Sequence, residues 1–448
     1  MSSEQNVHRQ YARPGFLCSA SMGILLVLVY LILAALPITL AYLSKKHTGL
    51  SLWMELGKAA ALVGFAILAL QVALAARFKF ADRPFGLDAI MQFHKGMAIF
   101  AGLLLIAHPI LISASFGDFS LLKFGAGKEV NFGKAALILL LLTILFALVF
   151  RRLHVSYQVW RFLHKAAVLV VILGFAHGLL MADDFAAKSV RICAWAVVIA
   201  VAGLFLYRNL IVPTWGRQRF RVLSVAPQTH NTWTLTFQPE PGDRIAPYRP
   251  GQFMFLTLRR KGFRAEQHPF TISSSPTREG VITATIKESG DYTKTIGQTA
   301  AQDTALIEAP FGRFSFVHHD AKQFLFVAGG VGITPIMSML RFLRDTGNRR
   351  PVVLLYGNHT ERDIIFRDEL EAMPPHLTVV HVLSNPSEEW KGLRGYIAAE
   401  VIKQNAGGSL SESDVYLCGP PPMRKAVLKA VKSLGVSARR IHYEKFSI

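Results

Sequence analysis

The sequence has few cysteines and little charge for its length. Three of its 448 residues are cysteines, none of them in a Cys-x-x-Cys pair, and only 17% are charged. A disulfide-stabilised scaffold needs more cysteines, a thiolate zinc site needs paired ones, and a disordered chain needs more charge. These three classes are therefore excluded, and the 52% of hydrophobic residues becomes the feature to explain.

The charge is also unevenly placed along the chain. Residues 1–215 carry 19 Lys/Arg and 8 Asp/Glu, whereas residues 216–448 carry 30 and 21. The first part contains six apolar stretches of about 18–25 residues, each long enough to cross a bilayer as a helix. They run approximately over residues 22–43, 52–75, 89–112, 133–150, 159–181 and 190–212. We therefore predict an N-terminal segment (1–21), a six-span membrane domain (22–215) and a soluble part after it.

Four histidines lie inside the predicted spans. His94 and His108 are in the third span, and His164 and His177 are in the fifth. Ionisable side chains are costly in a membrane and indicate function. The spacings of 14 and 13 residues correspond to roughly 20 Å along a helix, and the two spans run in the same direction. His94 can therefore face His164, and His108 can face His177. Each pair could supply the two axial nitrogens of a low-spin haem iron.

The spacing in the fifth span is not ideal for this pairing. Fourteen residues return a helix nearly to the same face, but thirteen leave it about 140° away. We therefore expect a local distortion between His164 and His177, and Gly174 lies there and could permit one. From the residues alone, two alternatives remain open. The histidines could be buried side chains bonded to carbonyls, or members of a proton or metal path.

Two histidine pairs on the third and fifth of six spans resemble the ferric reductase and NADPH oxidase superfamily of transmembrane flavocytochromes b. The segment Ser156–Arg161, which leads into His164, also resembles that family. The resemblance covers nearly the whole chain. It implies an NAD(P)H-dependent oxidoreductase with FAD, NADPH or NADH, and two b-type haems as cofactors. The haem ligands that it implies are His94, His108, His164 and His177.

Residues 216–320 alternate in short strands with turn residues, which predicts a small antiparallel β-barrel. Within it, the run from His268 to Pro276 resembles the flavin motif of the ferredoxin-reductase fold. The residues that this resemblance implies for FAD binding are His268, Pro269, Phe270, Thr271, Ser273, Ser274, Lys287, Gly290 and Thr293. His268 stands where the family usually has arginine. Backbone N–H groups and the threonine hydroxyl of the turn Gly290–Thr293 could hold the pyrophosphate instead.

Residues 321–448 have a different period, with strands and helices in turn. A strand over 324–328 leads into a glycine-rich turn and then a helix, an arrangement that favours a phosphate group. Further strands at βαβ spacing predict an open parallel α/β sheet that binds NAD(P)H. The last strand ends in Cys418, and the motif that follows resembles the family's Cys-Gly-Pro-Pro, which implies a catalytic cysteine beside the nicotinamide. The residues expected to bind the nucleotide are Gly329, Gly330, Gly332, Thr334, Pro335, Arg362, Gly419 and Pro420.

Two further residues bear on nucleotide choice and on access to the flavin. A 2′-phosphate needs a cation, and Arg362 is the first candidate, with Lys391 and Arg394 further along the chain. This favours NADPH modestly over NADH. The resemblance also implies that a near-terminal aromatic residue covers the flavin and yields during hydride transfer, and Phe446 is placed for that role.

Electron numbers then order the cofactors. A nicotinamide gives two electrons as hydride and haem iron takes one, so a flavin must stand between them. We expect transmembrane electron transfer from NAD(P)H to O2 or a ferric chelate outside, with no obligate protein partner. The protein would lie in a bacterial inner or plasma membrane with both termini cytosolic. Its net charge of +20 suits anionic lipid and phosphate-bearing cofactors rather than nucleic acid. Two alternatives are a haem subunit that feeds a periplasmic partner and a histidine-based metal transporter with an appended reductase.

Overall fold

The computed structural model divides the chain into two compact units, one ending at Thr214 and the other beginning at Trp215. The residues that it describes are 20–44, 51–120, 123, 127–150, 152–181, 188–407 and 410–444. The predicted fold class, a helical membrane domain followed by flavin- and nucleotide-binding domains of the ferredoxin-reductase type, is confirmed.

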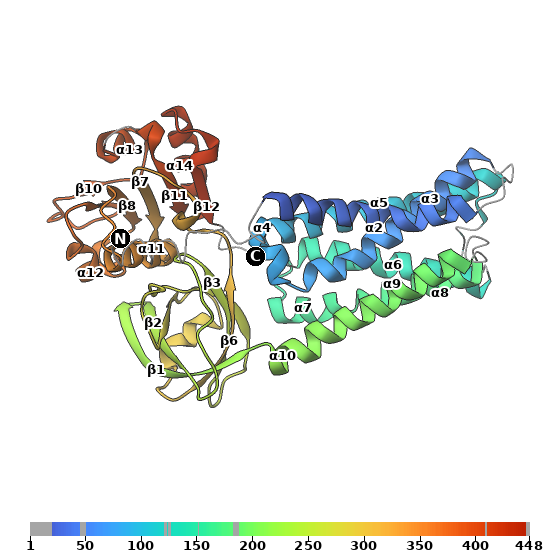
Figure 1. Cartoon of the computed structure of the whole chain (residues 1–448), viewed down its shortest axis with the longest axis horizontal. Helices are drawn as coiled ribbons and strands as arrows, with labels where there is room; N and C mark the ends of the chain where they lie inside the picture. The colour runs from blue at the N-terminus through green and yellow to red at the C-terminus, as the bar shows by residue number, and fades with distance from the viewer. Residues whose placement is uncertain are drawn as a thin grey trace. The chain divides into compact units, whose positions relative to one another are not determined.

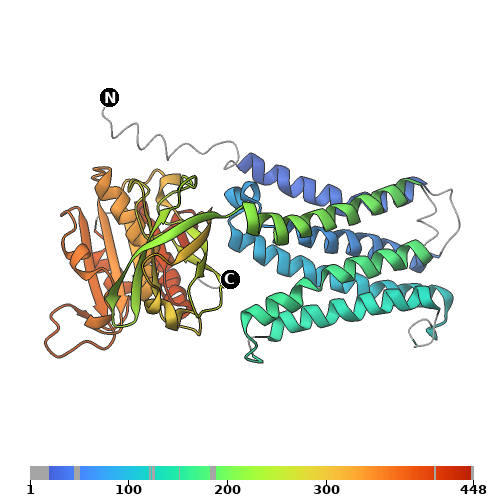
Figure 2. The same cartoon turned by 90° about the horizontal axis from the view of Figure 1, so that it is seen from below.

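The membrane unit contains six apolar segments long enough to cross a bilayer within the described residues. They are α2 (Ala20–Ser44), α3 (Leu52–Ala75), α5 (Leu87–Phe116), α6 (Lys128–Val149), α7 with α8 (Tyr157–Met181), and α9 with η4 and α10 (Lys188–Trp215). Figures 1 and 2 show these helices side by side, with the short α4 (Lys79–Phe85) between α3 and α5. Only 11–33% of each apolar window is buried, so most of their side chains are left to face lipid.

The fifth span is distorted, as expected, but not at Gly174. It is broken into α7 (Tyr157–Lys165) and α8 (Val168–Met181), directly after His164. Backbone N–H groups of residues 166, 167, 169 and 170 each bond to the carbonyl three residues earlier. Such turns rotate about 20° more per residue than an α-helix, which over six residues recovers roughly 120° of the 140° deficit. Gly174 instead lies inside the regular helix α8, where the ring of Phe65 packs against it.

The soluble unit begins with an antiparallel sheet in the order β4-β3-β6-β1-β2-β5. Its strands are β1 (Gln218–Thr229), β2 (Thr232–Pro239), β3 (Phe253–Arg259), β4 (Gln267–Thr271), β5 (Ile282–Lys287) and β6 (Thr304–Phe311). The strand pairing does not close this sheet into a barrel. The end strands are joined by one backbone hydrogen bond, from Ser273 N to Thr283 O (2.9 Å), rather than by a ladder.

The second sheet is parallel throughout, in the order β10-β9-β8-β7-β11-β12. Its strands are β7 (Phe324–Gly329), β8 (Val352–Asn358), β9 (Leu377–Leu383), β10 (Leu393–Arg394), β11 (Asp414–Cys418) and β12 (Ile441–Glu444). Alternate strand residues enter two separate cores, one shared with α11 (Ile333–Asp345) and α12 (Arg367–Glu371). The other is shared with α13 (Ala399–Asn405) and α14 (Pro421–Ser433).

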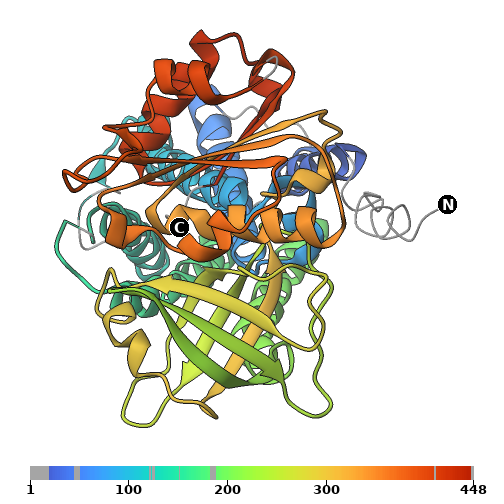
Figure 3. The same ribbon diagram turned by 90° about the vertical axis from the view of Figure 1, so that its left-hand side faces the viewer.

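Helix α11 lies between the two sheets of the soluble unit (Figures 1 and 3). From it, Ser338 Oγ donates to the carbonyl of Ser274 (2.7 Å), and Arg341 Nη1 donates to the carbonyl of Ser273 (2.7 Å). The loop that follows β4, which carries the predicted flavin motif, is therefore fastened to the nucleotide-binding half by backbone-directed hydrogen bonds.

Candidate functional site

The structure brings His94 of α5 and His164 of α7 together. Their ring centroids are 6.2 Å apart and their planes differ by 71°. The ring of Trp160 stacks on His164 at 5.1 Å and 21°, and the ring of Phe150 stacks on Trp160 at 4.9 Å and 17°. Nδ1 of His164 has no hydrogen-bond partner among the described residues. Aromatic stacking, rather than a hydrogen bond, holds this ring in place.

The second pair joins His108 of α5 and His177 of α8, with ring centroids 6.3 Å apart and an interplanar angle of 66°. Nδ1 of His108 donates to the carbonyl of Gly57 (3.0 Å), and Nδ1 of His177 donates to the carbonyl of Glu129 (2.8 Å). Because a carbonyl can only accept, Nδ1 carries the proton in both rings. Nε2 then keeps its lone pair and is the nitrogen available to a metal.

Both pairs fit a bis-histidine haem. A ligated imidazole nitrogen lies about 2 Å from its metal, so two rings on opposite sides of one iron have centroids roughly 6 Å apart. The observed 6.2 and 6.3 Å agree with that separation. The carbonyl bonds of the second pair account for Nδ1 alone and leave Nε2 for a further partner.

Two glycines allow close packing around the second pair, Gly133 against the His177 ring and Gly57 against Ile112 of α5, the helix that carries His108. A Cβ on Gly133 would lie 3.0 Å from three atoms of the His177 ring, and a Cβ on Gly57 would lie 2.8 Å from Ile112 Cδ1. Sequence reasoning missed both glycines, and it missed the stacking role of Trp160. The two glycines lie in other helices, far from the histidines along the chain, so no local pattern marks them, whereas Trp160 lies one helical turn before His164 in α7.

In the soluble unit, the two segments predicted to bind flavin meet at His268 and Tyr292. Their rings stack at 4.1 Å and 25°, and His268 Nε2 lies 3.0 Å from a carboxylate oxygen of Glu266. The buried Arg260 lies 5.4 Å above the Tyr292 ring and 4.4 Å above that of Phe263. Burial raises the pKa of Tyr292 to about 12. Arg260 is a cation beside the motif that sequence reasoning did not single out.

The hydroxyl groups predicted to touch the flavin bond to the protein itself. Ser273 Oγ lies 2.9 and 3.1 Å from the hydroxyls of Thr283 and Thr285. Ser274 Oγ lies 2.9 Å from the Tyr248 hydroxyl. Thr271 is buried, Phe270 and Lys287 are partly buried, and Pro269 is exposed. The flavin motif is thus a strand and loop held in place by hydrogen bonds within the protein, and little of it is exposed.

The turn expected to hold a pyrophosphate is closed on itself. Thr293 Oγ1 accepts hydrogen bonds from the backbone N–H groups of Ser289 and Gly290, both at 2.9 Å. Of these two N–H groups, that of Gly290 belongs to the turn predicted to hold the phosphate. A phosphate bound here would replace the threonine hydroxyl as their acceptor.

The glycines of the nucleotide turn are explained by close backbone packing. A Cβ on Gly332 would lie 2.3 Å from the carbonyl oxygen of Cys418, and a Cβ on Gly329 would lie 2.9 Å from Pro420 Cδ. Gly419 is equally crowded, with Gly329 N 3.2 Å from its Cβ position, and Gly330 has a positive φ of 52°. The strand ends of β7 and β11 can meet only because these residues lack side chains.

Polar groups beside this turn are mostly satisfied within the protein. Thr334 Oγ1 donates to the carbonyl of Val331 (3.0 Å), and Pro335 is buried behind it. Tyr356 donates its hydroxyl to the carbonyl of Gly330 (3.1 Å). The amide of Asn358, next to that hydroxyl at the end of β8, has no partner in hydrogen-bond geometry among the described residues. Asn358 is a candidate nucleotide contact that sequence reasoning missed.

Cys418 ends β11 and is fully buried. Burial raises the pKa of its thiol well above the usual value, so the sulfur is protonated at neutral pH. Its pairing partner on β12 is Glu444, the last residue that the structure describes. Phe446, the residue expected to cover the flavin, lies outside the described residues.

The three cations considered for a 2′-phosphate differ in availability. Arg394 donates from Nη2 to the carbonyls of residues 387, 388 and 390 and so holds its own loop together. Arg362 and Lys391 are exposed, and neither makes a hydrogen bond or ion pair within the described part of the chain. Arg362, just beyond β8, is therefore an available cation at the carboxyl end of the sheet.

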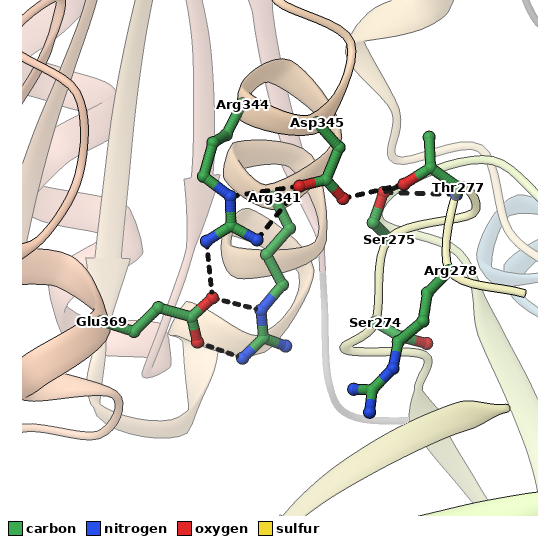
Figure 4. Close-up of a pocket in the computed structure, with 8 residues that line it drawn as sticks. All are labelled: Ser274, Ser275, Thr277, Arg278, Arg341, Arg344, Asp345 and Glu369. Carbon is green, nitrogen blue, oxygen red and sulfur yellow. Dashed lines mark hydrogen bonds and ion pairs between the residues drawn. The ribbon is translucent and has the colours of Figure 1, made fainter.

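A pocket of about 580 Å3 lies between the loop after β4 and α11 (Figure 4). Two of its arginines are paired with nearby carboxylates: Arg341 binds Glu369 through Nε and Nη2, at 2.9 and 2.5 Å. Arg344 contacts Asp345 and Glu369 at 3.0 and 3.1 Å. Although burial opposes it, these two arginines hold the pKa of Glu369 below its usual value. Of the residues predicted to bind FAD or NAD(P)H, Ser274 alone lines this pocket, which we interpret as part of the seam between the two halves.

Comparison with known proteins finds three families along the chain. Residues 60–175 match the ferric reductase like transmembrane component, residues 217–331 an FAD-binding domain, and residues 326–429 an oxidoreductase NAD-binding domain. These matches cover the middle of the membrane unit and most of both halves of the soluble unit.

Curated relatives resemble about half of the chain. The stachydrine N-demethylase reductase subunit Stc4 of Rhizobium meliloti is 33% identical over 49% of this chain and 64% of its own length. The glycine betaine monooxygenase reductase subunit of Chromohalobacter salexigens is 31% identical over 54% and 67%. NADH-cytochrome b5 reductase 1 of Lodderomyces elongisporus is 31% identical over 49% and 75%. The chain thus spans just under two thirds of the first of these relatives.

Proposed function

The chain belongs to the ferric reductase and NADPH oxidase-like superfamily of membrane-bound NAD(P)H-dependent oxidoreductases, and on that premise we propose that it transfers electrons across the membrane. The donor is NAD(P)H, the cofactors are FAD and two b-type haems, and the acceptor lies on the opposite side of the membrane. The observation that carries the proposal is that two pairs of histidines face each other at two depths of the helical unit, with ring centroids 6.2 and 6.3 Å apart.

The histidines would hold the haems in two layers, one on His94 and His164 and the other on His108 and His177. When bound, FAD accepts a hydride and releases single electrons, and haem iron exchanges one electron at a time. The protein would supply the histidine nitrogens that hold each iron, it fixes Nδ1–H of the second pair on carbonyls, and its apolar helices exclude water. With two histidines holding each haem, the acceptor would take electrons without binding to the iron.

In the soluble unit, we assign the FAD contacts to the β4 motif from His268 to Ser274 and to the segment from Lys287 to Thr293. The nucleotide contacts are assigned to the turn Gly329–Pro335 and to Gly419 and Pro420. Cys418 keeps its proton because burial raises its thiol pKa, so it would act beside the nicotinamide as a neutral, compact group and not as a nucleophile. Arg362 is the cation available for a 2′-phosphate, which favours NADPH.

The direction of electron flow gives the orientation. NAD(P)H is a cytosolic nucleotide, and the six candidate spans among the described residues support an assignment of both termini to the side where NAD(P)H binds. We therefore assign both ends to the cytosol of a cell whose inner or plasma membrane holds the protein. Outward movement of an electron from a negative interior is favoured by about 2.3 kcal/mol per 100 mV.

Two acceptor classes fit this arrangement. Oxygen or a ferric chelate could be reduced at the outer face, which is the simplest outcome for a chain of this architecture. A partner protein is the second candidate, because two of the relatives are named as reductase subunits of demethylase or monooxygenase systems. Those names describe the relatives, and for this chain they make electron delivery to a protein worth testing directly.

Turnover in proteoliposomes tests the proposal. The full chain is reconstituted with FAD, NADPH is added on the side of the soluble unit, and superoxide-sensitive cytochrome c reduction is compared with ferric-chelate reduction. We expect a b-type difference spectrum with about two haems per chain and NADPH-driven reduction on the opposite side. Absence of a Soret band from well-folded protein would overturn the haem assignment and favour the metal-transporter alternative. Turnover that appears only with an added partner protein would favour the second acceptor class.

A further inference from the structure

Three side chains able to ligate a metal meet at the amino end of the parallel sheet. They are His319 in the loop before β7, Asp414 at the first position of β11, and His442 in β12. One ligand atom from each lies within 4.8 Å of the others. The nucleotide residues lie at the carboxyl ends of the same strands, so this cluster is separate from the proposed redox sites.

The spacing of these atoms is close to what a tetrahedral metal requires. His442 Nε2 lies 3.6 Å from Asp414 Oδ2, and the rings of His319 and His442 have centroids 4.1 Å apart at 31°. With bonds of about 2.0–2.2 Å, neighbouring ligand atoms on zinc lie roughly 3.4 Å apart. The Asp414–His442 pair already has nearly that separation, and a rotation of the partly exposed His319 side chain could bring in the third atom.

The nitrogen of His442 needs a partner. Its Nε2 is buried, and no hydrogen-bond partner for it exists among the described residues. The carboxylate at 3.6 Å is too distant for a hydrogen bond. The ring is also held in position, because it stacks on Tyr416 at 4.6 Å and 25°. A buried, fixed and unpartnered imidazole nitrogen is costly in a folded protein unless something binds it.

The Asp414 carboxylate is oriented as metal-binding carboxylates commonly are. Asp414 is buried, and its Oδ1 accepts a hydrogen bond from Arg440 Nη1 (3.2 Å), which also donates to the carbonyl of Glu412 (2.7 Å). Oδ2 is the oxygen that faces His442. Ligating carboxylates are commonly fixed by an outer hydrogen bond of this kind. Arg440 therefore orients Asp414, although its charge also lowers the attraction for a cation.

We propose that His319, Asp414 and His442 form a three-ligand site for a divalent transition-metal ion of the zinc class, with water in the fourth position. Two imidazoles and one carboxylate suit zinc, copper or nickel better than magnesium or calcium. The site joins the loop before β7 to the edge strand β12 and to β11. Its role is to fasten β12, the strand that runs on beside Cys418 to Glu444.

Zinc binding to the full chain tests this site. The protein is purified in detergent without a histidine tag, freed of zinc with a chelator, and titrated with zinc chloride against a chromophoric chelator. We expect one zinc ion per chain and a rise in the unfolding temperature of the soluble unit. His319→Gln, Asp414→Asn and His442→Gln should each weaken binding at least about 100-fold, since each removes a direct ligand. His376→Gln, a change at a half-buried histidine outside the cluster, is the matched control and should leave binding unchanged.

Three outcomes distinguish a zinc site on these three ligands from a zinc site elsewhere or none. Zinc K-edge absorption of the loaded protein should show two imidazoles and an oxygen ligand at about 2.0–2.2 Å. The site is wrong if the wild type binds no zinc at about 100 μM, or if His319→Gln and His442→Gln bind it as tightly as the wild type. Because His319 is partly exposed, His319→Gln is the variant least able to disturb folding, and flavin content and circular dichroism check that it has not.

Discussion

The histidine pairs of the membrane unit and the flavin and nucleotide turns of the soluble unit present their functional groups in opposite ways. His108 and His177 bond to carbonyls through Nδ1 and leave Nε2 open. In the soluble unit, by contrast, Thr293 and Thr334 have their hydroxyls occupied by nearby backbone groups. The histidine pair therefore has a nitrogen free for a ligand before the ligand binds. In the flavin and nucleotide turns, a bound ligand would have to replace hydrogen bonds that the turns make within themselves.

The surroundings explain this difference. In lipid, an imidazole cannot exchange its partner for water, so its second nitrogen must be placed where its ligand will be. A loop in water can hold itself together with its own hydroxyl groups and release them at little cost, because water or a phosphate takes over. Rigid helices and adaptable turns are therefore suited to different cofactors.

Removing one histidine gives the largest effect and tests the paired arrangement. His108→Leu and His177→Leu should each lose the haem of that layer and retain the other, leaving about one haem per chain, because a single axial nitrogen does not hold a low-spin centre. The measurement is the pyridine haemochrome content of purified protein. His154→Asn is the control, because His154 is exposed and has a positive φ of 54° that asparagine tolerates. Two haems retained in either leucine variant would contradict the ligand assignment.

Gly133→Ala tests whether the second layer is arranged in advance as tightly as the structure indicates. The new Cβ would lie 3.0 Å from three atoms of the His177 ring, so the ring must move away from its carbonyl acceptor. Overpacking of this kind costs about 1–3 kcal/mol, and we expect partial loss of that haem with the first layer intact. Gly96→Ala is matched to it, since nothing lies within 4 Å of that Cβ position. If both variants have the same haem content and the same redox titration, the His177 ring can move aside more easily than its contacts with Gly133 and the Glu129 carbonyl indicate.

The fold class could be predicted from the sequence, and so could the pairing of the four intramembrane histidines. Six apolar runs predicted the six spans, and intramembrane histidines at spacings of 14 and 13 predicted which rings would face each other. The distortion in the fifth span also followed from helix periodicity. The position of this distortion could not be predicted, because the three-residue turns after His164 are made by backbone hydrogen bonds, which no residue type indicates.

What could not be predicted depends on contacts between distant segments. Gly57 and Glu129 act through backbone carbonyls, which carry no sequence signal at all. Arg260 joins the flavin motif through its stacking on Tyr292, and its neighbours in sequence are ordinary surface residues. The predicted barrel was also too simple, since closure depends on how far the end strands reach toward each other.

Thr293→Val tests the turn of the soluble unit that is held by its own hydroxyl, and it should reduce cofactor binding less than the changes in the membrane unit do. In the absence of flavin, the loss of the hydroxyl that accepts from Ser289 N and Gly290 N should lower the free energy of unfolding by about 1 kcal/mol. If this hydroxyl and these amides also meet the FAD phosphates, FAD affinity should fall roughly tenfold, which is about 1.4 kcal/mol. Thr293→Ser keeps the hydroxyl and should resemble the wild type. Fluorescence titration with FAD decides, and unchanged affinity in the valine variant would restrict Thr293 to closing the turn.

Cys418→Ala gives the smallest expected change in stability. It tests, through the pH dependence of the unfolding free energy, whether the Cys418 thiol in the nucleotide-binding half is shielded from water. Because burial raises the pKa of the Cys418 thiol well above its usual value near 9, the folded protein keeps the proton at a pH where the unfolded chain loses it. The unfolded state then binds fewer protons, so wild-type stability falls as the pH rises above about 9. Below that pH both states are protonated, and the difference in unfolding free energy between wild type and variant should be constant. Urea denaturation at pH 7, 8 and 10 measures it, with FAD content as the control. A difference that does not change between pH 8 and 10 would mean that the thiol is less shielded than its full burial in β11 implies.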